Sequence, residues 1–517
     1  MPCWCLGNCP HIGEPIEAMK AGRAGQAETL LRRNLSDAPL CVECNLMLAS
    51  IMGGSNRAWS GELHLARARK IAGDDPRVML ERARNLRAQA KPRQAADAFA
   101  DAIELQKDNP EAWGGKIGAL EAAGELEAAA DAFTAASSAF GGELPPAIRF
   151  EGATVCLARD DPAGAVALLD KDNATPIERL LRGRAKEALG DYAGAWSDWT
   201  EAKLELHNRQ GHVYTREHFL QLFAGLYEIS QPARFRMLVP CPELEIAPGP
   251  LFVTGFPRSG TTMLETALAS HSRIIDGDEV MGIADVTHTL PRLARSSLPY
   301  PHCLMSTTLG DSATLLTMCR DLYWRNLQAK LGFNFGPADY PAGAIGQNWA
   351  AYVTDKMPLN ETHLPLICLL FPRAPFIYCR RHPLDILVST LSYHLPNGGH
   401  YAESIETTAE HLAGADALLQ HYKATLPLDR FREIKYENLV NDFAGELESL
   451  LELCGLELEP ACLEFHKNPR HSRTISYAQI HKPLYTSSVG RFKNFRPFLG
   501  PVMQWIEPIL KREGYNA

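Results

Sequence analysis

Apolar residues recur along this chain in two different patterns, and the change between them falls near residue 250. From about residue 15 to residue 230 the chain is rich in Ala, Leu, Glu and Arg, with Gly or Asp at the interruptions, which predicts one helix after another. After residue 250, short apolar runs alternate with helical segments. We predict strands at 251–255, 375–379 and 433–436 and helices at 261–270, 311–331, 383–393, 405–424 and 442–454. That order is typical of an α/β domain with a mainly parallel sheet covered by helices.

The helical half has an internal period. Asp75-Pro76 is followed 34 residues later by Asn109-Pro110, and Ala98-Phe99 is followed by Ala132-Phe133 at the same interval. Two landmarks with one period favour repeats over the alternative, a non-repeating helical bundle. The pattern resembles tetratricopeptide repeats, which are pairs of antiparallel helices with small residues where the helices cross. Such a solenoid offers a concave face for a protein partner, or an arm for a homodimer.

Prolines separate the two halves. They are Pro232, Pro240, Pro242, Pro248 and Pro250. Repeated proline disfavours helix and predicts an extended connector. The expected organisation is therefore a helical solenoid over 1–230, a proline-rich linker over 231–250 and a P-loop-like α/β domain over 251–517.

The junction between the first strand and the first helix of the second half has the layout of a phosphate-binding loop. Gly255 and Gly260 have the spacing of such a loop, but Thr261 stands where a nucleoside-triphosphate loop needs Lys. The cation lies inside the loop, at Arg258. Backbone amides and a helix N-terminus still suit an anion, so we expect a nucleotide whose 5′ end is not a triphosphate. The predicted phosphate contacts are Gly255, Pro257, Arg258, Ser259, Gly260, Thr261 and Thr262.

Two further motifs carry charged groups suited to proton transfer and charge neutralisation. Glu279 ends the run Asp276-Gly-Asp-Glu279, behind a short strand at 273–275, and can act as a general base. Lys356 follows the apolar pair Tyr352-Val353, where an ammonium can stabilise charge on a leaving oxygen. Taken alone, Glu279 fits an acidic surface turn equally well, and Lys356 is more typical of a surface residue.

A second anion site is predicted after the strand at 375–379. Arg381 follows that strand, and Ser389 lies on the next helix, so the two can hold a second phosphate. Tyr436, at the end of another strand, can stack on a base, although a lone tyrosine is more often part of the core. The run Ser487 to Phe495, with Arg491, mixes basic and aromatic residues and has no assignment without context.

Composition excludes several classes of protein. The 517 residues are 46% hydrophobic and 22% charged, as in ordinary globular proteins, and the net charge of −9 disfavours a nucleic-acid partner. No apolar run reaches the ~18 residues of a membrane span, since prolines and Arg373 interrupt the best candidate, Leu364 to Cys379. The start of the chain lacks the pattern of a signal peptide, so we expect a cytoplasmic protein.

The thirteen cysteines are scattered, which favours reduced thiols. Cys3, Cys5, Cys9 and His11 form one group of possible metal ligands, and Cys41 and Cys44 form a C-x-x-C pair. Their spacings match no common zinc module, and the alternative is a frayed terminus with two cysteines on a helix face. We therefore predict no metal site.

In combination, these motifs resemble the sulfotransferases that use 3′-phosphoadenosine 5′-phosphosulfate, over about residues 250–510. The chain is most similar to the bacterial type that joins tetratricopeptide repeats to a sulfotransferase domain, whose catalytic half is similar to tyrosylprotein sulfotransferases. The motifs that carry the resemblance, in family order, are Pro257-Arg-Ser-Gly-Thr-Thr262, Asp355-Lys-Met-Pro358, Arg381 with Ser389 eight residues on, Tyr436-Glu-Asn-Leu-Val440, Ser476-Tyr-Ala-Gln-Ile-His-Lys-Pro483 and Ser488-Val-Gly-Arg-Phe492.

The resemblance implies roles for individual residues. Loop 257–262 holds the 5′-phosphosulfate, Arg381, Ser389 and Arg491 hold the 3′-phosphate, and Tyr436 contacts adenine. Glu279 is the general base, while Arg258, Lys356 and Ser476 are catalytic groups that stabilise the transition state. The chain departs from the family pattern at Asp278, at His382, where an acidic residue is more usual, and at Phe492, which replaces Trp. The membrane anchor of the tyrosylprotein enzymes is absent.

The implied reaction transfers a sulfuryl group to an acceptor hydroxyl, with no metal required. Two other functions remain open: a P-loop nucleotide kinase-like enzyme, which Thr261 argues against, and an inactive repeat scaffold that binds protein partners. The acceptor is not identified, since a peptide, a sugar, a lipid or a small molecule all present the same hydroxyl chemistry. Residues 284–350 are expected to shape the acceptor pocket.

Overall fold

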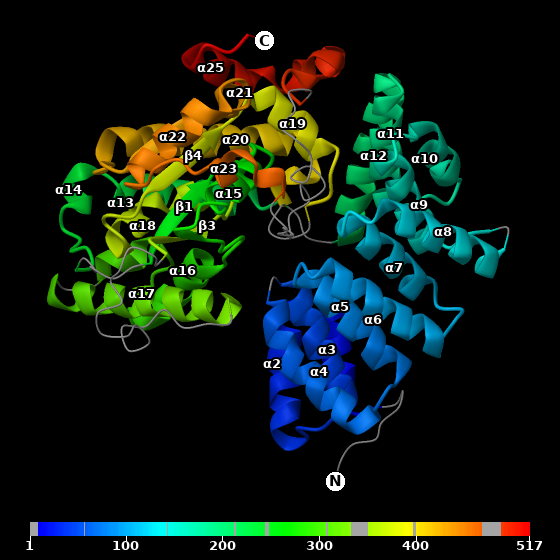
Figure 1. Ribbon diagram of the computed structural model, residues 1–517. Helices are drawn as coiled ribbons and strands as arrows, with labels where there is room; N and C mark the ends of the chain where they lie inside the picture. The colour runs from blue at the N-terminus through cyan, green and yellow to red at the C-terminus, as the bar shows by residue number, and fades with distance from the viewer. Residues whose placement is uncertain are drawn as a thin grey trace. The chain divides into compact units, whose positions relative to one another are not determined.

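The computed structural model describes residues 9–55, 57–141, 143–210, 214–242, 248–306, 309–331, 350–395, 400–467 and 488–516 (Figure 1). The chain divides into two compact units. The helical unit comprises Met1–Val213 with Leu391–Ser404, and the sheet unit comprises Tyr214–Thr390 with Ile405–Ala517. Each unit has hydrophobic cores of its own.

The helical unit is built from successive helices. They are α1 (Gly13–Lys20), α2 (Ala24–Asp37), α3 (Val42–Gly54), α4 (Ala58–Ala72), α5 (Pro76–Ala88), α6 (Pro92–Leu105), α7 (Pro110–Ala122), α8 (Leu126–Phe140), α9 (Pro146–Ala158), α10 (Pro162–Leu169), α11 (Pro176–Ala188) and α12 (Tyr192–Gln210). Neighbours along the chain pack as pairs, such as α5 with α6 and α11 with α12, while α7 also packs on α9. The helical expectation is confirmed. Its assignment to tetratricopeptide repeats stays a prediction.

The 34-residue period has a physical basis at the helix starts. Asp75 caps α5 by accepting a hydrogen bond from the Arg77 amide at 2.9 Å, and Asn109 caps α7 by accepting one from Glu111 at 3.0 Å. In both cases proline follows at the first helical position, where its missing N–H has no intrahelical partner to lose. The Asp-Pro and Asn-Pro landmarks are therefore helix start signals.

Small residues face aromatic rings where the helices cross. A Cβ at Gly115 on α7 would come within 2.4 Å of the Phe99 ring on α6. Gly152 on α9 meets Phe133 on α8 in the same way, at 2.3 Å. Glycine at these crossings lets one helix backbone approach the ring that the preceding helix inserts.

Among its described residues, the sheet unit contains five strands. They are β1 (Gly249–Thr254), β2 (Ile274–Ile275), β3 (Tyr352–Asp355), β4 (Phe376–Arg380) and β5 (Phe431–Lys435). Their order is β2-β3-β1-β4-β5, and every pairing is parallel, as expected from the sequence. The apolar runs of β1 and β4 are continuous because both faces of these strands are buried, whereas the edge strand β5 has a mixed sequence and is only partly buried.

Helices cover both faces of the sheet (Figure 1). Phe252 of β1 packs into one core with α16 (Gly282–Leu293), α17 (Leu309–Leu331), α18 (Leu364–Leu370) and α20 (Ile405–Thr425). Leu251 and Val253 point to the opposite core with α15 (Thr261–Leu268), α21 (Tyr436–Asn441) and α22 (Phe443–Leu453). The remaining described helices of this unit are α13 (Arg216–Ile229), α14 (Pro232–Phe235), α19 (Pro383–Leu391), α23 (Pro460–Leu463) and α25 (Met503–Glu513).

The boundary region differs from the sequence expectation. The proline-rich segment was expected to be extended, but it begins with the short helix α14, since Pro232 occupies a first-turn position that tolerates proline. Residues 243–247 of the expected linker lie outside the described residues. Upstream, α13 belongs to the sheet unit, where the Phe223 ring lies 5.5 Å from that of His411 on α20.

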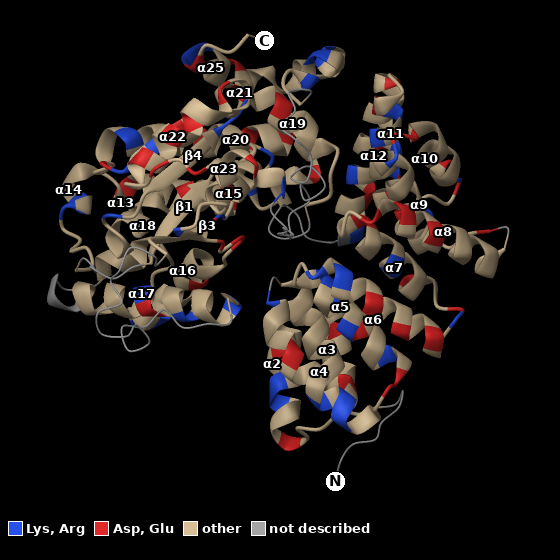
Figure 2. Ribbon diagram, in the orientation of Figure 1, with Lys and Arg blue, Asp and Glu red and all other residues tan. Residues whose placement is uncertain are grey.

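Charges are mixed on both units. Figure 2 shows Lys and Arg interspersed with Asp and Glu along the described helices, without a large surface of one sign in this view. Within the described ranges, none of the helices combines the length and apolar character that crossing a bilayer requires.

Candidate active site

Each strand of the sheet ends at a motif that the sequence singled out. Loop 255–260 follows β1, Asp276–Glu279 follows β2, Lys356 follows β3, Arg381 follows β4 and Tyr436 follows β5. Because all the pairings are parallel, these points lie at one edge of the sheet. In open α/β sheets, ligands bind outside the carboxyl ends of the strands. This edge is therefore the candidate site.

Two glycines hold loop 255–260 against its neighbours. Gly260 has a φ of +99°, and a Cβ there would come within 2.4 Å of the Tyr436 ring. A Cβ at Gly255 would come within 2.4 Å of the Cys379 carbonyl oxygen. Larger residues would push the loop away from β4 and α21, so both glycines are required by close packing as well as by the turn.

Arg258 connects the loop to two other predicted site residues. Its backbone has a φ of +73°, in the left-handed region that non-glycine residues adopt rarely. Its Nε donates to the Oγ of Ser389 at 3.0 Å, and its carbonyl oxygen accepts from Nη1 of Arg381 at 2.8 Å. The structure thus brings the first and second predicted anion sites into direct contact.

Two donors at this junction lack a partner among the described residues. They are the Nε of Arg381 and the Oγ of Ser259, and both atoms are buried. Buried polar atoms are nearly always hydrogen-bonded, so unsatisfied ones require an explanation such as a ligand or ordered water. Anionic groups of a ligand bound at this edge of the sheet would supply acceptors for these donors.

Tyr436 packs at the same place. The Arg381 guanidinium lies 4.8 Å from the centre of its ring, and its hydroxyl lies 2.8 Å from the Oγ of Ser488. Arg381 also donates to the Ser488 carbonyl oxygen at 2.5 Å. Tyr436 is 5% exposed, so its present contacts are those of a packed residue that supports Arg381.

Asp385 positions the segment that contains Arg491. Its two carboxylate oxygens accept hydrogen bonds from the backbone amides of Gly490 and Phe492, each at 2.8 Å. These bonds fix the start of the 3₁₀ helix η5 (Arg491–Phe498) against α19, the helix that also carries Ser389. Asp385 was not singled out as a site residue, and its spacing alone gives no sign of this role.

Lys356 and Glu279 form a second group of contacts. The Lys356 side chain is fully buried, with its Nζ 2.9 Å from Oε1 of Glu279 and 3.4 Å from Oδ1 of Asp278. Burial lowers the pKa of Lys356, but the Glu279 and Asp278 carboxylates raise it more, so that it lies above its usual range. The ammonium therefore stays charged in contact with the predicted base.

The two groups of contacts meet beside β1. The amide of Leu359, three residues after Lys356, donates to the Gly255 carbonyl oxygen at 3.3 Å. The Thr254 hydroxyl lies 3.0 Å from the Met357 carbonyl oxygen. The lysine loop and the glycine loop are thus direct neighbours at the sheet edge.

Residues 250–460 match the model described as the sulfotransferase family. The chain is similar to that family over this segment, which is less than half of its length. A relative from Aquifex aeolicus (strain VF5), itself described as uncharacterized, is 27% identical over 266 residues, which are 51% of this chain and 33% of the relative. The chain therefore spans about a third of the length of this curated relative.

Solved structures show partial likeness. A sulfotransferase domain from the curacin biosynthetic pathway covers 53% of this chain and 99% of its own, with a TM-score of 0.34 and 17% identity. One from the Synechococcus PCC 7002 olefin synthase covers 54% of this chain and 99% of its own, with a TM-score of 0.34 and 19% identity. The sulfotransferase STF1 from Mycobacterium tuberculosis H37Rv covers 74% of this chain and 98% of its own, with a TM-score of 0.29 and 13% identity.

The sheet unit has a buried support for its acidic loop, residues 276–279, that the sequence did not reveal. Glu265 on α15 accepts from the Asp278 amide at 2.9 Å and from the Thr354 hydroxyl at 2.6 Å. The same hydroxyl accepts from the Gly277 amide at 2.8 Å. Lys330 on α17 donates to the Gly277 and Glu279 carbonyl oxygens. These contacts fix the loop that carries Glu279.

Asp355, directly before Lys356, is a further buried carboxyl group. Burial raises its pKa to about 7, although hydrogen bonds from Tyr323 at 3.0 Å and Asn360 at 3.1 Å favour its charged form. These two donors fix the end of β3. Asp355 therefore helps to fix the position of Lys356, the residue that follows it.

Two departures from the family pattern contact each other in this domain. The His382 ring stacks on Phe492, with centroids 4.2 Å apart and planes at 15°. The His382 amide donates to Oε1 of Glu437 at 2.8 Å, and burial lowers the pKa of the imidazole. His382 is thus a packing residue between β4 and η5. The predicted catalytic Ser476 lies outside the described residues.

Proposed function

We propose that this protein transfers a sulfuryl group from 3′-phosphoadenosine 5′-phosphosulfate to a hydroxyl group of an acceptor. In this proposal, residues 255–262 bind the 5′-phosphosulfate. Arg381, Ser389 and Arg491 bind the 3′-phosphate, and Tyr436 lies beside the adenine. The observation that carries the proposal is the meeting of Arg258, Ser389 and Arg381 beside the glycine loop of a domain that matches a sulfotransferase family.

The residues at this edge suit a nucleotide with two separate anionic groups. Loop 255–260 leads into the N-terminus of α15, whose amides and dipole favour one anion. The unpartnered Nε of Arg381 offers a donor to a second anion. Arg is well suited to phosphate because its donors form a planar fork. A nucleotide phosphorylated at both 3′ and 5′ positions presents these two groups.

The chemical step in this proposal is an in-line displacement at sulfur. Glu279 takes the proton of the acceptor hydroxyl, and the acceptor oxygen forms a bond to sulfur. The bond between sulfur and the bridging phosphate oxygen breaks, so that 3′-phosphoadenosine 5′-phosphate leaves with the electron pair. Arg258 and Lys356 offset the negative charge that collects on the bridging and equatorial oxygens. Ser476 is proposed to donate a further hydrogen bond.

Pre-placed charges of this kind have a large effect on the barrier. Removing one donor of this type costs about 3–4 kcal/mol in acyl-transfer enzymes, which corresponds to ~10²–10³ in turnover. Lys356 is suited to such a role because its charge is already present and its position is fixed by burial. It therefore needs no reorganisation when charge develops.

The proposed acceptor is a molecule with a hydroxyl group, and its class is left to experiment. An acceptor screen with radiolabelled sulfate donor on the full chain would identify it. Peptides, sugars, lipids and small phenols form the panel. Labelled product in one class, lost when Glu279 is replaced, identifies the acceptor.

Calorimetric titration of the full chain tests the proposed function. Three ligands are compared: 3′-phosphoadenosine 5′-phosphate, adenosine 5′-phosphate and ATP with magnesium. We expect the bisphosphate to bind more tightly than either of the others. Preferred binding of ATP with magnesium would instead support a nucleotide kinase, and no binding of any nucleotide would support an inactive scaffold. Either result would contradict the proposal.

A further inference from the structure

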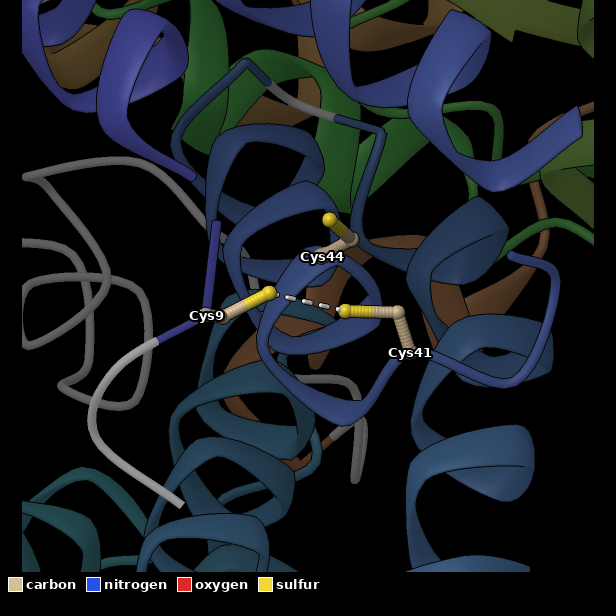
Figure 3. A group of neighbouring side chains, drawn as sticks. All are labelled: Cys9, Cys41 and Cys44. Carbon is tan, nitrogen blue, oxygen red and sulfur yellow. Dashed lines mark hydrogen bonds between the residues drawn. The ribbon is translucent and has the colours of Figure 1, made fainter. Parts of the chain in front are cut away.

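Three cysteines from distant parts of the sequence meet in the helical unit. Cys9 precedes α1, Cys41 lies at the N-cap of α3, and Cys44 lies in the first turn of α3. Their sulfur atoms all lie within 4.8 Å of one another. Figure 3 shows the side chains of Cys9 and Cys41 directed toward each other, with their sulfurs 3.3 Å apart, and Cys44 beside them.

The group is enclosed by an apolar core. Cys41 and Cys44 have no exposed surface, and Cys9 is 6% exposed. They belong to the core cluster that also contains Leu31 and Leu48. A dry, apolar surrounding holds metal ligands in place and excludes competing water.

The sulfur separations suit metal coordination better than a disulfide. A disulfide requires an S–S distance of about 2.05 Å, well below the 3.3 Å between Cys9 and Cys41. Zinc binds thiolate sulfur at about 2.3 Å, so two sulfurs on a tetrahedral zinc ion lie ~3.8 Å apart. The Cys9–Cys41 separation is 3.3 Å and the other two are at most 4.8 Å, which is compatible with that value.

We propose that Cys9, Cys41 and Cys44 bind one thiophilic divalent cation, with Zn²⁺ as the expected ion. Each thiol gives its proton to solvent as its sulfur bonds to the metal, so up to three protons are released for each ion bound. The three sulfurs fill three positions of a tetrahedron, and the fourth is left to water or another ligand.

The backbone around the group fixes the positions of the sulfurs. Cys41 and Cys44 lie at the N-terminal end of the 13-residue helix α3. The Cys41 carbonyl oxygen accepts a hydrogen bond from Asn45 at 2.8 Å, which holds the turn. The Asn34 side chain donates to the His11 carbonyl oxygen at 2.6 Å and so holds the segment after Cys9.

The site would connect the start of α1 to α3. The sequence spacing did not indicate it, because Cys9 lies 32 residues from Cys41. The C-x-x-C pair alone supplies two ligands, and the fold supplies the third. The His11 imidazole is not a member of the group that the described residues form. This proposal is independent of the proposed sulfuryl transfer, since it concerns the helical unit alone.

Metal content of the full chain tests the proposal without any substitution. The chain is purified under reducing conditions, incubated with Zn²⁺ or Co²⁺ and freed of loose metal by gel filtration. We expect about one ion per chain and, with Co²⁺, the sulfur-to-metal charge-transfer absorption typical of several thiolate ligands. A chain that retains no metal, or that shows a Cys9–Cys41 disulfide by mass spectrometry after this purification, would overturn the proposal.

Single substitutions then test the three ligands. Cys9→Ser, Cys41→Ser and Cys44→Ser should each lower the retained metal and weaken the charge-transfer band, while Cys156→Ser on α9 should leave both unchanged. Circular dichroism checks that each variant keeps its helices. Metal retention equal to that of the unchanged chain in all three ligand variants would refute the assignment. If a ligand variant does not fold, the presence or absence of the charge-transfer band in the cobalt spectrum of the unchanged chain still supports or refutes the metal site.

Discussion

Glu279 and Asp278 are adjacent carboxylates that contact one buried ammonium. Lys356 Nζ is 2.9 Å from the first and 3.4 Å from the second. Both residues therefore offset its charge, but only Glu279 is proposed to take the acceptor proton. The side chain of Glu279 is 27% exposed and that of Asp278 is 12% exposed, so Glu279 is the one more open to an acceptor.

Paired substitutions separate the two roles. Glu279→Gln keeps the size of the side chain and an oxygen for Lys356, but it cannot take a proton. We expect turnover to fall by at least ~10²-fold, the usual contribution of a general base. Asp278→Asn is the matched control and should cost much less. The measurement is steady-state sulfate transfer, and equal losses in the two variants would remove Glu279 from the base role.

Arg381 and Arg380 offer a second matched pair. Arg380 is occupied by Asp416 and by Glu433, so it holds the fold. Arg381 contacts backbone oxygens rather than carboxylates. Each arginine also has one buried nitrogen without a partner among the described residues, Nη2 in Arg380 and Nε in Arg381. Replacing Arg380 should therefore affect mainly the stability of the fold, and replacing Arg381 should affect mainly nucleotide binding.

Replacing Arg381 should reduce binding selectively. We expect Arg381→Lys to weaken 3′-phosphoadenosine 5′-phosphate by about 1.5–3 kcal/mol, or ~10–150-fold, because a charge-assisted hydrogen bond pair is lost. Adenosine 5′-phosphate, which lacks the 3′-phosphate, should lose much less. Calorimetry with both ligands gives the two values. Equal losses would refute the 3′-phosphate assignment.

His363 should make stability depend on pH. Burial lowers its pKa from 6.5 to about 4, and its Nδ1 lies 3.2 Å from the Tyr300 hydroxyl. The unfolded chain therefore takes up the proton first. The contribution of neutral His363 to the free energy of unfolding is fully present above pH 6.5. It is lost as the pH falls toward about 4, by ~1.4 kcal/mol per pH unit.

The change that isolates this effect is His363→Asn, which keeps a polar group near the Tyr300 hydroxyl. Chemical denaturation at pH 7 and pH 5 should show a smaller acid loss of unfolding free energy in this variant than in the unchanged chain. His218→Asn, at an exposed position, should behave like the unchanged chain. The same pH dependence in all three proteins would contradict the assignment to His363.

At the scale of elements, one buried ion pair joins neighbouring helices of the array. Arg149 on α9 donates to Glu178 on α11 at 2.9 Å, and their side chains are 4% and 1% exposed. Glu178 also completes the capping box at the start of α11 through the Thr175 amide. Removing the arginine would leave a buried carboxylate without its cation.

We expect Arg149→Ala to lower the free energy of unfolding of the helical unit by about 3–5 kcal/mol, the cost of an uncompensated buried charge. The control is Arg93→Ala, which removes an exposed pair with Glu125 and should cost less than ~1 kcal/mol. Thermal and chemical unfolding followed by circular dichroism give both values. Equal costs, or no recovery when Glu178→Gln is added to Arg149→Ala, would contradict this account.

The strands of the sheet unit and the candidate site residues that follow them were largely predictable, because both are marked by residues adjacent in sequence. Strands buried on both faces appear as short apolar runs, and the residue that follows each run lies at the ligand edge by geometry. Among the described helices of this unit, the prediction missed α14, α16, α18, α23 and α25, each of which contains a proline and so gives a conflicting helix signal. Glu265 was missed because its partners, Asp278 and Thr354, approach only after β2 and β3 pair.

At the scale of the whole molecule, the chain does not divide at a single point. The short segment Leu391–Ser404 belongs to the helical unit, where Glu403 accepts from His207 and Tyr393 lies beneath Arg184. The segment is bounded on both sides by the sheet unit. A linear sequence pattern could not predict this, because the residues that hold the segment lie about 200 positions earlier.

The helical unit also contains a cavity of about 440 Å³, lined by residues of α5–α7, α9 and α11 that include Phe99, Phe150 and Glu151. Burial raises the pKa of Glu151 to about 7. The cavity lies among the helix crossings where glycines admit aromatic rings.

The central claim is that the carboxyl edge of the sheet holds an adenine nucleotide phosphorylated at both ends of its ribose. A crystal structure of the full chain grown with 3′-phosphoadenosine 5′-phosphate tests it most directly. The account predicts the 5′-phosphate within hydrogen-bond distance of the amides of loop 255–262, and the 3′-phosphate on Arg381 and Ser389. A nucleotide bound elsewhere, or an open and empty edge beside Arg258 and Arg381 at saturating ligand, would contradict it.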